Sequence, residues 1–361
     1  MHTPGGNATY LICVLNELSA QQPEWVFYVL SNRPLHPECE KQIIKRPNIR
    51  FLCKSFTRIG LLWYCTQLYF ILKKLNPDFF WAPATLLPPF IPSGVKTIVT
   101  VNDLVAKDYK HTMSLINRIY SGVLFDRSLM NADVLLAISN YTADEVRRRY
   151  QGRRSCDINI GCGVDRSIFQ LQAHTPEQRK EICSKYGVSE QFILFVGTIE
   201  PRKNLTFMLN LMPQLAAAGF SLLVVGARGW GKTPIADIVQ QVEFPADKVV
   251  FAGFVPTEDL VRLYNVAMVY VSTSMNEGFG LPQLEAMNCG CPVVSPHNSA
   301  MIEVVEGAGR TVKGWDPAIW CDTILSVNNN REKYRKLGLQ RSEQYQWPAV
   351  ARSITLTLSR P

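Results

Sequence analysis

A glycine-containing segment in the second half of the chain carries two carboxylates beside an expected anion site. It reads Asn276-Glu277-Gly278-Phe279-Gly280-Leu281-Pro282-Gln283-Leu284-Glu285-Ala286 and follows an apolar strand predicted at 268–271. The glycines permit a tight loop, and Pro282 suits the first turn of a helix. Backbone N–H groups from Gly278 to Leu284 would then face outward at a helix N-terminus, where the partial positive charge favours an anion.

Glu277 and Glu285 flank this expected anion site, with seven residues between them. A diphosphate bound there would leave one carboxylate to hold hydroxyls on one side and the other to hold hydroxyls on the far side. Sugar, diphosphate and ribose in that order describe a nucleotide-diphosphate sugar. We therefore interpret Glu277 and Glu285 as ligands of such a molecule.

Two adjacent cations mark a second candidate site. Arg202 and Lys203 lie in the segment Val196-Gly197-Thr198-Ile199-Glu200-Pro201-Arg202-Lys203-Asn204, which follows a strand predicted at 192–196. Loops at the carboxyl ends of parallel strands are where open α/β sheets bind ligands. The two cations would neutralise a leaving diphosphate without a metal. Such a pair is also common on a solvated surface, and the sequence alone leaves both readings open.

Short apolar segments alternate with helical ones along the whole chain, which is typical of parallel sheets covered by helices on both faces. The pattern occurs twice, so it predicts an α/β protein of two domains with a boundary between 165 and 190. Strands are predicted at 26–30, 49–52, 79–81, 97–101, 134–138, 192–196, 221–225, 249–251, 268–271 and 292–294.

Two helix starts stand out. Thr175-Pro176-Glu177-Gln178 has Thr at the N-cap, Pro at the first helical position and Gln at the third, and this helix would end at Gly187. A similar start is predicted at Thr142-Ala143-Asp144-Glu145, after the strand that ends at Ile138.

The two chemical segments together resemble the retaining GT-B glycosyltransferases of family 4 (glycosyl transferases group 1), and among them the mannosyltransferase-like subgroup. The resemblance covers most of the chain and is supported by Ala137-Ile138-Ser139, Gly163-Val164-Asp165 with Phe169, Ala252-Gly253-Phe254-Val255 and Trp347. It implies two Rossmann-like parallel-sheet domains that face each other across a cleft. The expected bounds are 1–170 for an acceptor domain, 171–344 for a nucleotide-sugar domain and 345–361 for a helix that returns to the first domain.

The resemblance also implies the site residues. The cations would contact the donor diphosphate, the first carboxylate the transferred sugar and the second the ribose, while the glycine loops of both domains would offer backbone donors. The implied catalytic residues are Glu277, Arg202, Lys203, Asn102 and Asp103. The implied donor-binding residues are Gly5, Gly6, Gly278, Phe279, Gly280, Leu281 and Glu285.

The activity so implied is transfer of a hexose with retention of the anomeric configuration, with the donor phosphate helping to remove the acceptor proton. No metal and no cofactor are expected, and the nucleotide-diphosphate sugar is the donor substrate. GDP-mannose is weakly preferred over UDP-linked hexoses. The expected acceptor is a glycan or lipid-linked glycan of surface polysaccharide synthesis, such as lipopolysaccharide, and the expected place is the cytoplasm or, peripherally, the inner face of the cell membrane.

Two departures from the family pattern leave open that the chain is a non-catalytic or truncated GT-B protein. The family usually has His-Asp where this chain has Asn102-Asp103. An asparagine still forms hydrogen bonds but cannot carry a positive charge. The family also begins with a strand before the glycine loop, and only four residues precede Gly5. A sheet lacking that strand would expose backbone edges and apolar faces.

A competing motif predicts a different enzyme. Gly226-Ala227-Arg228-Gly229-Trp230-Gly231-Lys232-Thr233 fits the phosphate-loop pattern G-x4-G-K-[ST] and follows the apolar strand predicted at 221–225. On this reading the protein is a Mg²⁺-dependent NTPase centred on Lys232. No later apolar strand ends in an aspartate that would hold the metal, since the run 268–271 is followed by Ser-Thr-Ser.

The charge of the chain is concentrated in its first half. The net charge is +8, and residues 1–160 hold 19 Lys and Arg against 12 Asp and Glu. We expect this basic half either to be a solvated face without a partner or to meet an anionic membrane surface. No nucleic acid partner is expected. Residues 59–72 are uncharged, too short to span a bilayer, and are predicted to form a buried helix rather than one that enters a membrane interface.

The cysteines and histidines predict neither a disulfide framework nor a metal site. The ten cysteines include no CxxC pair, and the five histidines lie far apart in the sequence. We therefore expect reduced thiols, as in a cytosolic protein.

Overall fold

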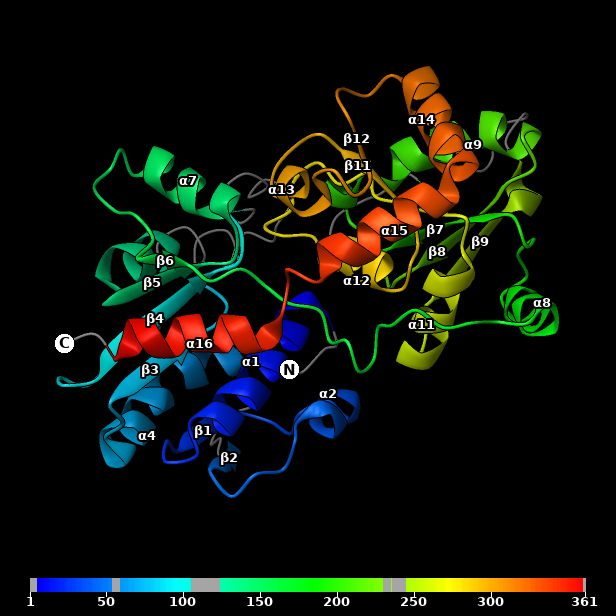
Figure 1. Ribbon diagram of the computed structural model, residues 1–361. Coiled ribbons are helices and arrows are strands. Elements are labelled where there is room, and N and C mark those ends of the chain that lie inside the picture. Colours follow the sequence, from blue (N-terminus) through cyan, green and yellow to red (C-terminus); the bar gives the residue numbers. More distant parts are fainter. Residues whose placement is uncertain (1–4, 54–58, 105–123, 230–234, 236–244, 360–361) are drawn as a thin grey trace. The chain divides into compact units, whose positions relative to one another are not determined.

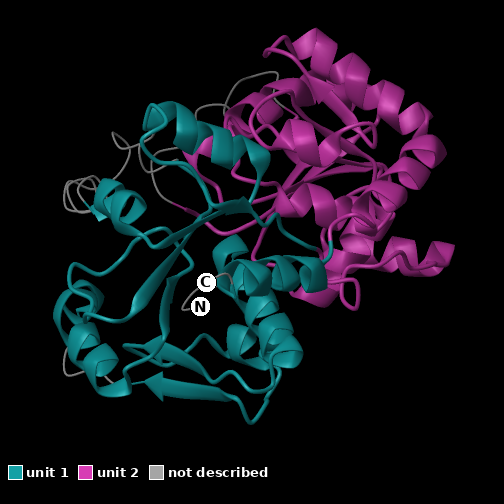
Figure 2. Ribbon diagram, turned by 60° about the vertical axis from the view of Figure 1, so that its left-hand side comes forward, with its two compact units in different colours: residues 1–163, 346–361 teal, residues 164–345 magenta. Residues whose placement is uncertain are grey.

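The computed structural model describes residues 5–53, 59–104, 124–229, 235 and 245–359 (Figure 1). Its contacts divide the chain into two units, coloured separately in Figure 2. Unit 1 consists of residues 1–163 and 346–361, and unit 2 of residues 164–345. The sequence placed these boundaries after 170 and after 344. The two points where the chain leaves unit 2 are adjacent, because the Val164 N–H donates to the carbonyl of Tyr345 (3.3 Å).

Unit 2 is a doubly wound parallel sheet of six strands. In the order in which they pair, the strands are β12 (Arg310–Val312), β11 (Val293–Pro296), β10 (Val269–Val271), β7 (Phe192–Val196), β8 (Ser221–Val225) and β9 (Val249–Gly253). The first strand in the chain, β7, therefore lies between the second, β8, and the fourth, β10. This is the topological switch point, where open α/β sheets bind their ligands.

Helices cover both faces of this sheet, and β7, β8, β10 and β11 are almost entirely buried, which explains their continuous apolar sequence. A hydrophobic core joins one face of these strands to the helices after β7 and β12 and includes the fully buried Trp320. The helices within the described part of unit 2 are α8 (Pro176–Lys185), η3 (Pro201–Lys203), α9 (Leu205–Ala217), η4 (Ala246–Lys248), α11 (Thr257–Val266), α12 (Leu281–Asn288), α13 (Met301–Val305), α14 (Pro317–Asn329) and α15 (Arg331–Ser342).

The parallel strands of unit 1 form two separate sheets. One pairs β1 (Phe27–Ser31) with β2 (Ile49–Cys53), and the other runs β3 (Phe79–Ala82), β4 (Lys96–Val101), β5 (Val134–Ala137) and β6 (Ile158–Asn159). In unit 2 the strand β7 occupies the position between the second and fourth strands. Among the described residues of unit 1 no strand occupies the matching position between β1 and β3, so both are edge strands.

The last helix of the chain belongs to unit 1. Helix α16 (Trp347–Leu358) packs on α1 (Gly6–Gln21), and the ring of Trp347 lies edge-on to that of Tyr10, with centroids 5.9 Å apart. Gly163 permits this contact, because a Cβ there would overlap the backbone and ring of Trp347. The other helices in the described residues of unit 1 are α2 (Pro37–Gln42), α3 (Gly60–Leu62), the π-helical turn η1 (Trp63–Gln67), α4 (Leu68–Leu75) and α7 (Asn140–Arg149).

One of the two predicted helix starts is confirmed. Thr175 caps α8, with both hydrogen bonds of a capping box to Gln178. The other start is wrong by three residues: the N-cap of α7 is Ser139, whose hydroxyl accepts from the Thr142 N–H (3.0 Å). A short hydroxyl at the end of β5 is already in reach of the first turn, so the helix begins earlier than the acidic residues indicated.

All ten cysteines are free, and most of them are buried. In the part of the chain that the structure describes, no helix combines the length and the apolar character needed to cross a membrane.

Candidate functional site

The two chemical segments of unit 2 meet at the switch point of its sheet. The loop with Arg202 and Lys203 follows β7, and the loop with Glu277 follows β10. These strands are neighbours, with Tyr270 paired to Leu194. The loops are joined by backbone and hydroxyl contacts, since the Met275 N–H donates to the Arg202 carbonyl (2.8 Å) and the Thr273 hydroxyl donates to the Lys203 carbonyl (3.0 Å).

Glu277 holds both predicted cations. Its Oε2 accepts from Nη1 of Arg202 (2.7 Å), and its Oε1 accepts from Nζ of Lys203 and from the hydroxyl of Ser274 (2.7 Å). The side chains of Arg202, Lys203 and Glu277 are each only 13% exposed. This rules out the reading of Arg202 and Lys203 as a solvated surface pair, because both are largely removed from water and directed into one cluster.

A second carboxylate completes the charge balance. Oε1 of Glu200 accepts from Nε (3.0 Å) and Nη2 (2.7 Å) of Arg202, and the Glu200 side chain is 7% exposed. The guanidinium is thus held between Glu200 and Glu277, and its plane is fixed. Two cations and two carboxylates give the cluster a formal net charge of zero.

The electrostatics of Glu277 follow from this arrangement. Burial alone would raise its pKa, but the charges of Arg202 and Lys203, together with the hydrogen bonds from Lys203 and Ser274, lower the pKa to about 2. Glu277 is therefore a carboxylate at any physiological pH. An ionised, acceptor-only group beside two cations can hold sugar hydroxyls while the cations face phosphate oxygens.

The glycine loop after Glu277 leads into α12 as predicted. The Glu277 N–H donates to the Ser299 hydroxyl (3.1 Å), and Gly280 stands at the N-cap with φ 127°, a conformation that side chains other than glycine rarely adopt. Phe279 is buried against the ring of Tyr345, with centroids 5.6 Å apart, and anchors the loop.

The expected backbone anion site is shorter than the sequence indicated. The Leu284 N–H donates to the Gly280 carbonyl (3.2 Å), so it belongs to the helix ladder. Leu281 is the first residue of α12, Pro282 has no N–H, and the first-turn donors have no acceptor within the helix. Backbone donors for an anion at α12 therefore come before Leu284.

Glu285 lies on α12 in a different environment from Glu277. Burial raises its pKa to about 7, although a hydrogen bond from the Tyr264 hydroxyl to Oε2 (3.2 Å) acts in the opposite direction. The two carboxylates that the sequence paired thus differ in pKa by about five units, because only Glu277 has cationic partners. Divergent pKa values on neighbouring carboxyl groups are typical of functional sites.

The structure adds Gln283, which the sequence analysis did not single out. Gln283 is 1% exposed, its Oε1 lies 3.1 Å from the position that a Cβ on Gly280 would take, and its Nε2 has no hydrogen-bond partner among the described residues. A buried amide donor without a partner is costly. The signal for Gln283 in the sequence was that a polar residue stands near the apolar Leu284 and Ala286 on the same predicted helix.

The predicted residues of unit 1 form a separate group at the end of β4. Nδ2 of Asn102 donates to Oδ1 of Asn7 (3.0 Å) and to the carbonyl of Pro83 (2.9 Å), while Oδ1 of Asn102 is buried without a partner among the described residues. Asn102 and Asp103 line a cavity of about 120 Å³ together with Asn7. Gly5 is the N-cap of α1 and Gly6 its first residue, so the glycine pair lies directly before Asn7.

The described part of the competing phosphate-loop motif is occupied by backbone contacts. The Gly226 N–H donates to the Gly253 carbonyl (2.8 Å), and the Gly229 N–H donates to the Ile199 carbonyl (3.0 Å). A phosphate loop needs such N–H groups for its anion. A Cβ at Gly226 would overlap the carbonyl of Gly197, so this glycine serves close packing between two loops. Residues 230–233 of the motif, with Lys232, lie outside the described residues.

A prediction follows for this motif. Gly226→Ala is expected to lower the free energy of unfolding by about 2–4 kcal/mol, because the new Cβ must displace backbone. Gly314→Ala is the control, since Gly314 also has positive φ (73°) but no atom near its Cβ position; it should cost only about 1 kcal/mol. Urea unfolding measures both. Equal losses in the two variants would show that packing does not explain Gly226.

Two family models match the chain, one in each unit. The model described as "Glycosyltransferase Family 4" matches residues 4–167, and the model described as "Glycosyl transferases group 1" matches residues 190–330. Among curated relatives, O-antigen chain mannosyltransferase B of Escherichia coli is 29% identical over 285 residues, which cover 76% of this chain and 72% of the relative.

Other relatives are longer than this chain. The serotype-specific mannosyltransferase WbdA of Escherichia coli is 28% identical over 235 residues, which are 61% of this chain but only 28% of WbdA. The fold is shared with solved structures at low identity. These include HepE of Anabaena in complex with UDP-glucose (TM-score 0.76, 16% identity, 99% of this chain and 97% of HepE) and WaaG, a glycosyltransferase involved in lipopolysaccharide biosynthesis (TM-score 0.74, 15% identity, 100% and 98%).

Proposed function

The chain belongs to the family 4 glycosyltransferases of the GT-B fold, and from that premise we propose that it transfers a hexose from a nucleotide-diphosphate sugar with retention of configuration. The observation that carries this proposal is the buried cluster of Glu277, Arg202 and Lys203 at the switch point of unit 2. The donor lies along the N-terminus of α12, with its sugar at Glu277, its diphosphate at Arg202 and Lys203, and its ribose at Glu285.

The chemistry follows from what the cluster can hold. As the bond between the anomeric carbon and the phosphate oxygen breaks, negative charge accumulates on the diphosphate, and Arg202 and Lys203 stabilise it. The acceptor hydroxyl forms its new bond on the same face of the sugar, and its proton passes to the departing phosphate oxygen. Because two cations already face the leaving group, the reaction proceeds without a metal ion.

Asn102 sets the main difference from the family pattern. Its amide nitrogen donates to Asn7 and Pro83, and its buried oxygen remains able to accept a hydrogen bond. In this proposal Asn102 and Asp103 position hydroxyls by hydrogen bonding and contribute no positive charge, so the charge that develops in the reaction is stabilised mainly from unit 2.

The preferred donor is GDP-mannose, and the acceptor is a glycan or lipid-linked glycan of lipopolysaccharide O-antigen synthesis. The mannosyltransferases of Escherichia coli among the relatives support this choice. HepE, of similar fold, was solved with UDP-glucose, so UDP-hexoses are the alternative donors. A lipid-linked acceptor places the enzyme in the cytoplasm, in peripheral contact with the inner face of the cell membrane.

Proton NMR tests the reaction directly. We expect slow release of free sugar from GDP-mannose without an acceptor, with the α-anomer as the first product and an unchanged rate in EDTA. UDP-glucose is the control donor and should react more slowly. The β-anomer as the first product would contradict retention, and a rate that falls to background in EDTA would contradict a metal-independent reaction.

A further inference from the structure

The loop after β11 holds the backbone of Glu277 on both sides. The Glu277 N–H donates to the Ser299 hydroxyl (3.1 Å), and the Ala300 N–H donates to the Glu277 carbonyl (3.3 Å). The loop is itself fixed to the neighbouring strand, because the His297 N–H donates to the carbonyl of Val312 at the end of β12 (2.7 Å). Since β7, β10 and β11 are adjacent in the sheet, the loops that follow all three strands meet at Glu277.

Glu277 belongs to a closed ring of hydrogen bonds with two serines and an asparagine. The Ser274 hydroxyl donates to Oε1 of Glu277 (2.7 Å). The Ser299 hydroxyl, which accepts from the Glu277 N–H, donates to Oδ1 of Asn298 (3.0 Å), and Nδ2 of Asn298 closes the ring by donating to the Ser274 carbonyl (3.4 Å). A serine hydroxyl has one proton, so the bond to Asn298 leaves a lone pair of Ser299 for the Glu277 N–H.

Ser299 has a strained backbone conformation. Its φ is 48°, in the left-handed region that glycine adopts freely and serine does not. Strain of this kind is found preferentially at functional sites. Two other non-glycine residues with positive φ in the described part of the chain also border the candidate sites, since Asn204 directly follows Lys203 and Thr85 lines the small cavity with Asn102. A glycine at position 299 would avoid the strain, so the hydroxyl explains the serine.

The hydrogen-bonded ring fixes Glu277 in a way that its ion pairs do not. Arg202 and Lys203 balance the charge of the carboxylate, but both are long side chains with many rotamers. The ring joins the backbone and the carboxylate of Glu277 to short side chains and to main chain. Groups that bind a reacting molecule need positions fixed to within about 0.5 Å, which locked neighbouring side chains provide.

We propose that Ser299 and Asn298 are positioning residues of the donor site. They set the place of the Glu277 carboxylate relative to the transferred sugar and do not touch the donor themselves. The inference rests on the proposed function, because that function assigns the sugar to Glu277.

Hydrolysis of the donor without an acceptor tests this inference on the full chain, with GDP-mannose and UDP-glucose as probes. With the faster of the two, the rate is expected to fall about 10–100-fold in Ser299→Gly and in Asn298→Ala, because a slightly displaced carboxylate loses its alignment with the sugar. The affinity for GDP and UDP, measured by calorimetry, should stay within about twofold, since Glu277 faces the sugar rather than the nucleotide. A residue that only supports the fold would lower the rate, the affinity and the stability together.

Ser299→Gly also separates the hydroxyl from the strain. Glycine adopts this φ freely, which offsets the lost hydrogen bonds, so the urea midpoint of unfolding should stay near that of the wild type while the rate falls. Ser299→Ala should lose the same rate and unfold at a lower urea concentration, because it keeps the strain. Gln151→Gly is the control, since Gln151 also has positive φ (50°) but is exposed in unit 1, and it should keep the wild-type rate.

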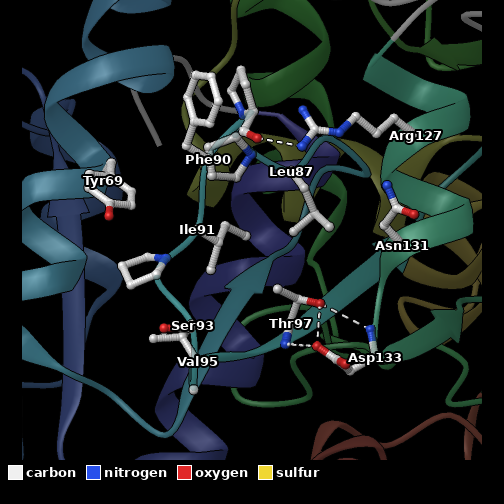
Figure 3. A pocket seen from close by; sticks show the side chains of 14 residues that line it. Tyr69, Leu87, Phe90, Ile91, Ser93, Val95, Thr97, Arg127, Asn131 and Asp133 are labelled. Carbon is white, nitrogen blue, oxygen red and sulfur yellow. Dashed lines mark hydrogen bonds between the residues drawn. The ribbon is translucent and has the colours of Figure 1, made fainter.

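Asn131→Ala is the control for Asn298→Ala, because it also removes a side-chain amide. Asn131 lines a cavity of about 430 Å³ in unit 1, with Thr97 at the beginning of β4 and with Asp133 (Figure 3). This variant should keep the wild-type rate and the wild-type affinity for nucleotide. A loss equal to that of Asn298→Ala would contradict a specific role for Asn298.

The double variant Ser299→Gly with Glu277→Ala shows whether the serine acts through the carboxylate. It should be no slower than Glu277→Ala alone, because the place of the carboxylate has no effect once the carboxylate is absent. Losses that add in the double variant, or a loss of nucleotide affinity as large as the loss of rate, would overturn the inference.

Glu277→Ala alone distinguishes the two levels of the argument. A wild-type rate in Ser299→Gly and in Asn298→Ala, beside a large loss in Glu277→Ala, would overturn the inference and leave the proposed function intact. A wild-type rate in Glu277→Ala would contradict the proposed function and, with it, the inference.

Discussion

Lys203→Ala is expected to lower the rate of sugar transfer by about 10²–10³, because it removes one of two charge-assisted donors to the departing diphosphate in a site with little water. Glu277→Ala should lose at least as much. That change removes the acceptor for the sugar hydroxyls, and it also removes the carboxylate that holds both Arg202 and Lys203. Initial rates of nucleotide release from the donor, with acceptor present, measure both effects.

Lys185→Ala is the matched control for Lys203. Lys185 also pairs with a carboxylate, Asp259 (2.6 Å), and also belongs to unit 2, but it lies on α8. Its removal should leave the transfer rate within about twofold, because the pair joins α8 to α11 and lies on neither of the loops that carry Lys203 and Glu277. Full activity in both Lys203→Ala and Glu277→Ala, with folding intact by thermal unfolding, would falsify the assignment of the site.

Glu285→Gln is expected to raise the free energy of unfolding and to weaken nucleotide binding. Burial raises the pKa of Glu285 to about 7, above its ordinary value of 4.5. Between these two values the folded protein keeps a proton that the unfolded chain has lost, so stability falls as the pH rises through this window. Glutamine removes that penalty. The variant should therefore be more stable than wild type by about 1–3 kcal/mol at pH 8 and equal to it near pH 4.

Nucleotide binding should change in the opposite direction. The ribose hydroxyls need an ionised acceptor, so the affinity of wild type should increase as the pH rises through about 7. Glu285→Gln should bind about 10–100-fold more weakly at pH 8 and show little pH dependence, since a hydrogen bond to a charged group is lost. Glu332→Gln, on an exposed residue of α15, should change neither property.

Urea unfolding across pH and calorimetric titration with nucleotide test both halves of this prediction. A variant that is less stable at pH 8 would contradict the burial argument. A variant that binds nucleotide like wild type, with the same pH profile, would contradict the role given to Glu285.

The sequence predicts the central strands of the sheets better than their edge strands. The ranges predicted for β7 and β8 agree with the structure residue for residue, because strands buried on both faces are continuous apolar runs. Two short edge strands, β6 and β12, were not predicted. They have only two and three residues and include the exposed Asn159 and Arg310, so they carry no apolar run.

The charged residues of the candidate site could be predicted from the sequence, but the contacts between them could not. Arg202, Lys203 and Glu277 stand out by type and by their place after strands. That Glu277 holds both cations follows only from the pairing of β7 with β10. Glu200 lies two residues before Arg202, yet the contact of its Oε1 with both Nε and Nη2 of Arg202 depends on the short η3 helix, which includes Arg202.

The phosphate-loop motif is the opposite case. The sequence pattern is present, but its first glycine serves close packing between two loops. Gly226 is the first glycine of the pattern and Gly229 lies within it, but in the structure both stand where two loops approach too closely for a Cβ. Sequence spacing alone does not separate a glycine that faces a phosphate from one that faces a neighbouring carbonyl.

Calorimetric titration with GDP, UDP, ADP and ATP, each with Mg²⁺ and with EDTA, tests the central claim most directly. The proteins compared are wild type, Glu285→Ala and Lys232→Ala. We predict that GDP binds in EDTA as well as in Mg²⁺, that Glu285→Ala weakens it, and that Lys232→Ala leaves it unchanged. Binding of ATP that requires Mg²⁺ and is lost only in Lys232→Ala would contradict the donor site at Glu277, Arg202 and Lys203 and would assign nucleotide binding to the phosphate-loop motif.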